Sequence, residues 1–194
     1  MIEVKGRKVV LKEATDKAID ELYFWKYEDK EQEAKKWNGP YIIEEKLSKG
    51  DYEKTWRQQL ITAVPASLVI TADEKTIGYV GAYWVDPNTD WLETGIVIYD
   101  KAYWDGGYGS EAYKLWIDFL FHHTHLHRLG MSTWSGNVRM IKVAEKLGMK
   151  EEARIREARK VSDQYYDAVK MGVLRKEWRP FEHSKRISRV WGDD

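Results

Sequence analysis

The segment Trp104-Asp105-Gly106-Gly107-Tyr108-Gly109-Ser110-Glu111-Ala112 is the part of the sequence that decides the predicted fold. It lies between a predicted strand over residues 91–99 and a predicted helix that begins near Tyr108. Three glycines before a helix let the backbone approach a ligand closely, and the first helical turn offers unpaired N–H groups with a partial positive charge. This glycine loop (residues 104–110) is therefore a candidate pyrophosphate site, although a tight glycine turn that binds nothing explains the same residues.

Two other kinds of phosphate-binding loop fit the segment less well. A Walker A loop ends in Gly-Lys-Ser or Gly-Lys-Thr, which is absent here. Gly107, Gly109 and Ala112 match the G-x-G-x-x-A pattern of dinucleotide-binding folds, but that pattern needs an acidic residue about 20 positions further on to hold the ribose. No Asp or Glu stands between Asp118 and Glu145, so the dinucleotide interpretation loses its second half.

Downstream of the glycine loop, the hydrophobic pattern alternates between helix and strand. A stripe at three- and four-residue spacing predicts a helix, and it consists of Tyr108, Ala112, Leu115, Trp116 and Phe119. Residues 128–134 predict a strand, after which Asn137 caps a helix of about ten residues that Gly148 ends. The order strand, helix, strand implies a parallel strand pair.

The remaining elements predict antiparallel hairpins around this unit. They are a strand near 8–11, a helix over 17–36, a second helix after Asp51 with Trp56, Leu60 and Ile61 inward, and hairpins of 68–70 with 77–85 and of 154–161 with 165–174. The predicted fold class is α/β, a single mixed, mostly antiparallel sheet with a central parallel strand pair flanked by helices. We expect one domain over residues 1–178 and a C-terminal tail over residues 179–194.

The composition limits the class of protein. A chain of 194 residues suits one domain of ordinary size. Lys plus Arg and Asp plus Glu are 32 each, so no global charge draws the chain to nucleic acid or to an anionic membrane. The absence of cysteine removes disulfides and thiolate chemistry and fits a reducing compartment. With neither a signal peptide nor a membrane-spanning run, we expect a soluble, cytoplasmic protein.

The glycine loop is also part of a longer ordered pattern. It comprises 93–98 (Glu-Thr-Gly-Ile-Val-Ile), 103–112, 127–129 (His-Arg-Leu), Asn137 with 145–149 (Glu-Lys-Leu-Gly-Met), and 165–171 (Tyr-Tyr-Asp-Ala-Val-Lys-Met). This pattern resembles the GNAT superfamily of N-acetyltransferases, most of all the branch that contains the ribosomal-protein N-terminal acetyltransferases. The resemblance covers residues 8 to 178 and is specific for the fold, but not for the substrate.

The resemblance implies that acetyl-CoA and an amine acceptor are the partners, with direct acetyl transfer in a ternary complex. The pyrophosphate would lie on the glycine loop, and the pantetheine arm would pair with a strand whose neighbour diverges. The implied cofactor-binding residues are Ile96, Val97, Ile98, Trp104, Asp105, Gly106, Gly107, Tyr108, Gly109, Ser110 and Asn137. For Asn137, a role as a plain helix N-cap is an equally good explanation.

Glu93 matches the carboxylate position of this branch and is the candidate catalytic base, with Asn137 as the second catalytic candidate. An ammonium has no lone pair, so a base or a water chain must take a proton from the acceptor. Glu93 and Val97 share a strand face next to the implied thioester, where burial is expected to raise the pKa of Glu93. A cross-strand salt bridge is the competing role. A backbone N–H near Val97 or Ile98 is the candidate oxyanion donor.

Two positions depart from the family pattern. Where many members have a lysine before Gly107, this chain has Gly106, so one phosphate-binding cation is missing. Where many have a tyrosine as general acid for the leaving thiolate, it has Ala144, so that Tyr108, Tyr165 or water would substitute, or the thiolate would leave unassisted. These gaps keep open a second function, a non-catalytic acyl-CoA-binding sensor or interaction module on the same fold.

Three further features bear on partners. His122, His123, His125 and His127 cluster in sequence, but we expect the end of a helix there and no metal site. Trp25, Trp37 and Trp56 lie in the region that lids the acceptor site in this family, as core staples or as walls of a substrate slot. Residues 28–53 carry eight acids against five lysines, which weakly favours a cationic amine. A homodimer is the candidate oligomeric state.

Overall fold

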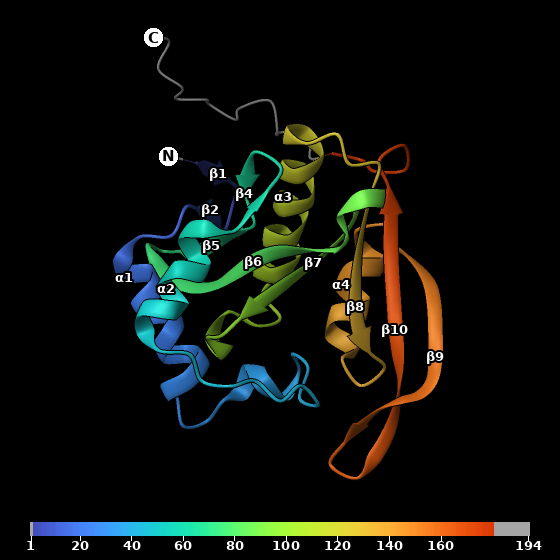
Figure 1. Ribbon diagram of the computed structural model, residues 1–194, viewed down its shortest axis with the longest axis horizontal. Helices are drawn as coiled ribbons and strands as arrows, with labels where there is room; N and C mark the ends of the chain where they lie inside the picture. Colours follow the sequence, from blue (N-terminus) through green and yellow to red (C-terminus); the bar gives the residue numbers. More distant parts are fainter. Residues whose placement is uncertain (1, 181–194) are drawn as a thin grey trace.

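The computed structural model describes residues 2–180, and its centre is one eight-stranded sheet in the order β1-β2-β5-β6-β7-β8-β10-β9 (Figure 1). Its strands are β1 (Glu3–Lys5), β2 (Val10–Lys12), β5 (Ser67–Ala72), β6 (Lys75–Asp86), β7 (Trp91–Ile98), β8 (Arg128–Trp134), β9 (Lys150–Val161) and β10 (Gln164–Leu174). Neighbouring strands are antiparallel except β7 and β8, which run parallel. The predicted fold class is confirmed.

Helical segments connect the strands and cover the sheet. They are α1 (Asp16–Tyr23), the π-helix η1 (Phe24–Glu28), the 3-10 helices η2 (Glu33–Lys36), η3 (Pro87–Thr89) and η4 (Lys101–Tyr103), and the α-helices α2 (Lys49–Gln58), α3 (Tyr108–His123) and α4 (Val138–Lys146). Two short strands, β3 (Leu60–Ile61) and β4 (Val64–Pro65), pair with each other outside the main sheet.

The hydrophobic core is divided between the two faces of the sheet. In β5, Leu68 and Ile70 belong to the larger core with α3, whereas Val69 belongs to a second cluster under α1 and α2. Because successive strand residues point to opposite faces, α3 and the pair α1 and α2 cover opposite faces. Helix α3 anchors the larger core with fully buried Tyr113 and Trp116. Burying a large side chain contributes about 1.5–3 kcal/mol.

The elements predicted downstream of residue 60 are confirmed. Strand β8 has the predicted bounds, and the Asn137 side chain caps α4 by accepting a hydrogen bond from the Met140 N–H at 3.2 Å. Gly148 follows the helix with a φ of +85°, as a C-terminal glycine should. The last hairpin, β9 with β10, is longer at its start than the sequence predicts.

The single helix predicted over residues 17–36 is wrong. Helix α1 ends at Tyr23 and continues as the π-helix η1, after which Asp29 leaves the helix with an extended backbone. The Asp29 carboxylate accepts a hydrogen bond from the backbone N–H of Gln32 at 3.1 Å. An aspartate that bonds to its own neighbouring backbone competes with helix formation, so the chain turns here and resumes as η2.

Two smaller predictions also differ from the structure. The strand near residues 8–11 is half of a hairpin, because β1 pairs with β2. Leu60 was predicted to face inward, but it lies in β3 with 60% of its surface exposed. Helix α2 has already ended at Gln58, so the helical periodicity that placed Leu60 inward no longer applies. The boundary at residue 178 stays a prediction, and most of the predicted tail, residues 181–194, lies outside the described residues.

Strands β7 and β8 separate soon after they meet. Within residues 2–180, Glu93 opposite Gly130 is the single aligned pair between them, and the Thr94 hydroxyl donates to the Gly130 carbonyl at 3.0 Å. The other edge of β7 stays paired with β6 as far as Ile98. The second half of β7 therefore has one edge in the sheet and one edge turned toward the opening between the two strands.

Candidate active site

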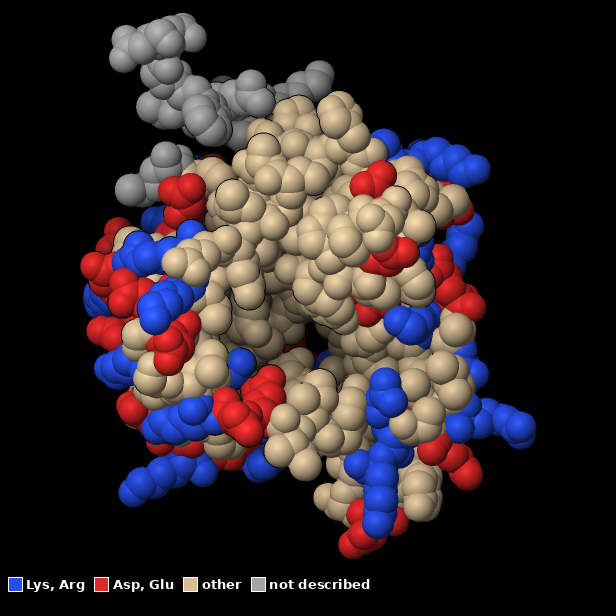
Figure 2. Space-filling model, viewed as in Figure 1, with Lys and Arg blue, Asp and Glu red and all other residues tan. Residues whose placement is uncertain are grey.

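A cleft of about 530 Å³ opens where β7 and β8 separate. Figure 2 shows the surface hollowed between the two sides of the molecule. The predicted cofactor-binding residues that line the cleft are Ile96, Ile98, Trp104, Asp105, Gly107, Gly109, Ser110 and Asn137. The structure therefore brings most of that set together around one space. Val97, Gly106 and Tyr108 do not line it.

The glycine loop presents the start of α3 to this cleft. Gly107 precedes the helix with a φ of +83°, a backbone conformation that favours glycine, and no described side chain caps the helix there. At Gly109 an added Cβ would lie 3.8 Å from the Ile98 side chain, so the backbone is open to the cleft. Uncapped N–H groups at a helix start suit an anionic group, and this geometry fits a pyrophosphate.

Cationic side chains from α4 border the cleft, and sequence reasoning missed them. Lys142 and Lys146 line it, and the Arg139 guanidinium lies 5.1 Å from the Trp37 ring and 4.8 Å from the Trp104 ring. Their spacing of three and four residues was the available signal, since it places all three on one helix face. Arg139 is paired with Asp105 at 3.1 Å, so Lys142 and Lys146 are the side chains of this group that add positive charge to a cleft where a helix also begins.

Asn137 connects the start of α4 to Trp37, which also lines the cleft. Its side-chain oxygen caps α4, and its amide Nδ2 donates to the Trp37 carbonyl at 3.1 Å. The indole of Trp134 donates to the same carbonyl at 2.9 Å. The capping role is therefore present, and the contact with Trp37 is one that the sequence did not predict.

Glu93 lies where β7 and β8 still pair, does not line the cleft, and is only 3% exposed. The Tyr83 and Ser132 hydroxyls donate to Oε2 at 2.8 and 2.7 Å, and the Lys170 ammonium donates to Oε1 at 2.6 Å. These four side chains come from β6, β7, β8 and β10, so they cross four neighbouring strands. The salt bridge that competed with the catalytic role in the sequence analysis is present.

The expected rise in the pKa of Glu93 is wrong. Burial does raise this pKa, but hydrogen bonds from Lys170, Ser132 and Tyr83, together with the Lys170 charge, outweigh burial and hold it below its usual value. Sequence reasoning accounted for desolvation on the strand but could not see three donors arriving from three other strands. Glu93 is consequently ionised at neutral pH.

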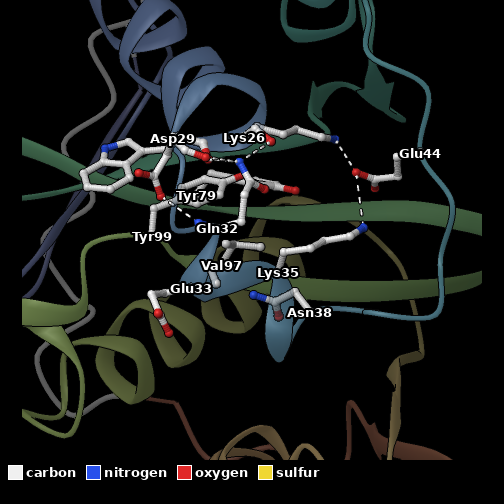
Figure 3. A pocket seen from close by; sticks show the side chains of 12 residues that line it. Lys26, Asp29, Gln32, Glu33, Lys35, Asn38, Glu44, Tyr79, Val97 and Tyr99 are labelled. Carbon is white, nitrogen blue, oxygen red and sulfur yellow. Dashed lines mark hydrogen bonds and ion pairs between the residues drawn. The ribbon is translucent and has the colours of Figure 1, made fainter. Parts of the chain in front are cut away.

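A second cavity of about 70 Å³ lies on the other face of β7 (Figure 3). Val97 lines it, whereas its neighbours Ile96 and Ile98 line the cleft. Ala34 and Asn38 line both spaces, so the cleft and the cavity meet at η2 and the residues after it. After the ligands that the family resemblance implies, we call the first space the cofactor cleft and the second the acceptor cavity.

Aromatic rings form much of the acceptor cavity. Trp25 stacks on Tyr99 with ring centroids 6.4 Å apart, and Tyr79 lies 6.3 Å from Tyr99. Burial raises the pKa of both tyrosines, so their hydroxyls stay protonated at neutral pH. Of the other two tryptophans considered above, Trp37 lines the cofactor cleft and Trp56 contacts Tyr79 from α2.

The acidic excess over residues 28–53 is largely paired. Glu44 lies in the acceptor cavity, 3.5 Å from the Lys26 ammonium and 3.7 Å from that of Lys35. Other pairs in this region are Glu28 with Lys46, Glu31 with Lys101, Glu33 with Lys36, Asp51 with Lys54 and Glu53 with Arg57. The charge count therefore supports a cationic acceptor less than the sequence suggested.

Neither tyrosine offered in place of Ala144 lines the cofactor cleft or the acceptor cavity. Tyr165 is 63% exposed on the last hairpin, and Tyr108 packs edge-on against Tyr103. Ala144 itself is fully buried within α4.

Among residues 2–180, no group of His, Cys, Asp or Glu is arranged to hold a metal ion. Each helix in the same range is too short or too polar to span a bilayer.

Comparison with known proteins agrees with this geometry. Residues 8–150 match the family model described as an acetyltransferase (GNAT) domain. A probable N-acetyltransferase of Bacillus subtilis, YjcK, is 29% identical over 105 residues, which are 53% of this chain and 57% of that protein. The chain therefore spans little more than half the length of this curated relative.

Solved structures share the fold at low sequence identity. Spermidine N-acetyltransferase from Vibrio cholerae, in complex with CoA and spermine, has a TM-score of 0.71 at 15% identity, covering 89% of this chain and 98% of that one. Ribosomal-protein-alanine N-acetyltransferase from Brucella melitensis has a TM-score of 0.68 at 15% identity, covering 84% and 98%. Their acceptors differ, so this likeness concerns the fold alone.

Proposed function

The chain belongs to the GNAT acetyltransferase family, and we propose that it transfers the acetyl group of acetyl-CoA directly to a primary amine. The observation that carries the proposal is the separation of β7 from β8 beside an uncapped helix start. An unpaired strand edge suits the amides of pantetheine, and a helix start suits a pyrophosphate.

The residues that would hold acetyl-CoA follow from this arrangement. The backbone of Trp104 to Ser110 would bind the pyrophosphate, and the free edge of Ile96 to Ile98 would bind the pantetheine arm. Lys142, Lys146 and Asn137 border the same cleft from α4. When bound, acetyl-CoA supplies an activated acyl group as a thioester. A backbone N–H near Val97 or Ile98 stays the candidate donor to its carbonyl oxygen.

The acceptor amine would approach from the acceptor cavity. That cavity and the cofactor cleft meet at Ala34 and Asn38, so an amine beside Val97 would lie next to the end of the pantetheine arm. Holding both reactants in one place supplies much of the rate of such a transfer.

The proposed acceptor is the amine of a small molecule or of a protein N-terminus. That the chain belongs to the ribosomal-protein branch stays part of this proposal. A cysteine-free chain suits the cytoplasm, and a homodimer stays a prediction.

Glu93 is the proposed acceptor for the amine proton, directly or through water. As an anion held by three donors, it is a weaker base than a carboxylate with a raised pKa, and water must carry more of the task. Its three donors also give it a second role, which is to hold β6, β7, β8 and β10 in register where the cleft begins. Both roles are separable by experiment.

A non-catalytic acyl-CoA sensor is the competing function. Two observations favour it. Ala144 stands where the family's tyrosine would protonate the departing thiolate, and the Glu93 carboxylate already accepts three hydrogen bonds within the protein. The two functions differ in turnover. Mass spectrometry of a broad amine panel incubated with protein and acetyl-CoA detects acetylated product in one case and unchanged amines in the other.

Glu93→Gln tests the proton acceptor. If Glu93 takes the proton, kcat at pH 7 falls by about 10²-fold and partly recovers as pH rises and free amine accumulates. Because hydrogen bonds and the Lys170 charge hold the pKa of Glu93 below its usual value, Glu93 is ionised near neutral pH, so the acid limb of the wild-type profile should follow the pKa of the acceptor amine.

Lys170→Met is the matched control for this test. It removes a donor and a charge but keeps the carboxylate, so the pKa of Glu93 should rise and the protein should retain turnover, with an acid limb that still follows the pKa of the acceptor amine. Wild-type turnover of Glu93→Gln across the pH range would show that Glu93 is structural. An equal loss in both variants would point to the strand register instead.

A further inference from the structure

We propose that Lys8, in the turn between β1 and β2, supplies the cation for the pyrophosphate of acetyl-CoA that the glycine loop itself lacks. The inference rests on the proposed function. The glycine loop has a glycine, Gly106, in place of a lysine that could bind phosphate. Lys8, which lies about a hundred residues earlier in the chain, contacts this position in the structure.

The Lys8 side chain reaches directly onto the glycine loop. Its ammonium donates to the Gly106 carbonyl at 2.6 Å and lies 5.3 Å from the centre of the Tyr108 ring. A Cβ atom added at Gly107 would be 4.0 Å from the same ammonium. Lys8 does not itself line the cofactor cleft, but Gly107 beside it does, and an ammonium has three donors, so the bond to Gly106 leaves donors for a phosphate oxygen at Gly107.

The turn that carries Lys8 is attached to α3 itself. The Glu111 carboxylate, only 9% exposed, accepts hydrogen bonds from the backbone N–H groups of Arg7 at 3.0 Å, Lys8 at 2.7 Å and Val9 at 3.1 Å. Glu111 lies in the first turn of α3, the same turn that begins at the glycine loop. The buried hydrogen bonds of Glu111 therefore fix the position of the Lys8 backbone relative to the glycine loop.

The charges near this position also favour an anion. The Glu111 carboxylate is occupied by the three N–H groups and lies 3.9 Å from the Arg7 guanidinium. Asp105, the other acid of the loop, pairs with Arg139 at 3.1 Å. Arg7 offsets the charge of Glu111 and Arg139 offsets that of Asp105, so the Lys8 ammonium and the α3 helix start present positive charge to the site.

Calorimetric titration of CoA and of dephospho-CoA into three variants tests the proposal. Dephospho-CoA keeps the pyrophosphate and lacks the ribose 3′-phosphate. Lys8→Met should weaken the binding of both ligands by the same factor, about tenfold or more, since a hydrogen bond to a charged group of 1.5–3 kcal/mol converts to that range. Lys8→Arg should retain most of the affinity. The affinity of Lys8→Met should also depend less on salt.

Lys5→Met is the matched control, because it removes the same charge from the same hairpin while its ammonium pairs with Glu3 at 3.0 Å. It should bind both ligands as the wild type does. Unchanged affinity in Lys8→Met, or a loss seen with CoA but not with dephospho-CoA, would overturn the assignment to the pyrophosphate. If wild-type protein bound neither ligand, the proposed function would fall together with this inference.

Discussion

The cofactor cleft and the acceptor cavity lie on opposite faces of β7, yet they are built in different ways. The cleft is formed mainly by the ends of regular elements, β7, α3 and α4, with Ala34, Trp37 and Asn38 closing one side. The cavity is closed by the π-helix η1, the 3-10 helix η2 and the segment around Glu44, which has no regular structure. One strand can therefore line two spaces, one bounded mainly by regular helices and strands and the other by short or irregular segments.

The walls also differ in what stabilises them. Helix α3 rests on the larger core through fully buried Tyr113 and Trp116. The acceptor side is held by exposed or half-exposed ion pairs, such as Lys26 and Lys35 with Glu44, each worth about 0–1 kcal/mol. A wall held by weak contacts opens more readily than one held by buried contacts. We therefore expect the acceptor side to adapt and the cofactor side to stay rigid.

The largest expected effect separates the two spaces completely. Gly109→Val places a branched side chain in the cofactor cleft, and CoA affinity should fall more than about 10²-fold by calorimetry. The fold should survive, because Gly109 does not have a positive φ and an added Cβ makes ordinary contacts at 3.8 Å. The circular dichroism spectrum should be nearly unchanged.

Gly50→Val, in the first turn of α2 with nothing within 4 Å of an added Cβ, is the control for the helical propensity of valine. It should bind CoA normally. Wild-type affinity in Gly109→Val would mean that the glycine loop does not bind the cofactor. The cleft would then no longer be distinguished from the cavity by its ligand.

An intermediate effect is expected from the acceptor side. Trp25→Ala removes the ring that stacks on Tyr99 in the acceptor cavity, so the KM for the acceptor should rise about tenfold, a loss of 1.4 kcal/mol in acceptor binding. The Kd for CoA, measured by calorimetry, should not change.

Phe24→Ala is the control for Trp25→Ala, since Phe24 is 47% exposed beside Trp25 and does not line the cavity. It should leave both constants unchanged. A Trp25→Ala protein that loses CoA affinity and retains its acceptor KM would reverse the assignment of the two spaces.

The smallest effect is expected at the junction. Asn137→Ser keeps a capping oxygen but loses the amide that donates to the Trp37 carbonyl. The second N–H of that amide is the candidate donor to the cofactor, and one neutral hydrogen bond of about 0.5–1.5 kcal/mol corresponds to a two- to tenfold weaker CoA affinity, while the lost bond to Trp37 should lower Tm by a few degrees. Asn137→Ala should lose the cap as well and melt about 2–4 °C lower. Equal affinity and equal Tm in Asn137→Ser would leave Asn137 with the capping role alone.

Local signals predicted the parts of the protein whose structure depends on residues close in sequence. The glycines before α3, the capping Asn137, the C-terminal Gly148 and the alternation along β7 each act within a few residues, so the elements downstream of residue 60 and eight of the eighteen residues that line the cleft could be read from the sequence. The helix over 17–36 could not, because Asp29 bonds to backbone N–H groups ahead of it and ends the helical run without a glycine or proline.

The sequence by itself determined the order of the main strands and helices downstream of residue 60, the glycine loop and the position of a carboxylate at residue 93. Only the tertiary structure decided how those residues are charged and surrounded. Lys170, Ser132 and Tyr83 reach Glu93 from three other strands and hold its pKa down, and Lys8 reaches Gly106 from the far end of the chain. Such contacts depend on which strands become neighbours, and the spacing of residues along the chain carries no record of that.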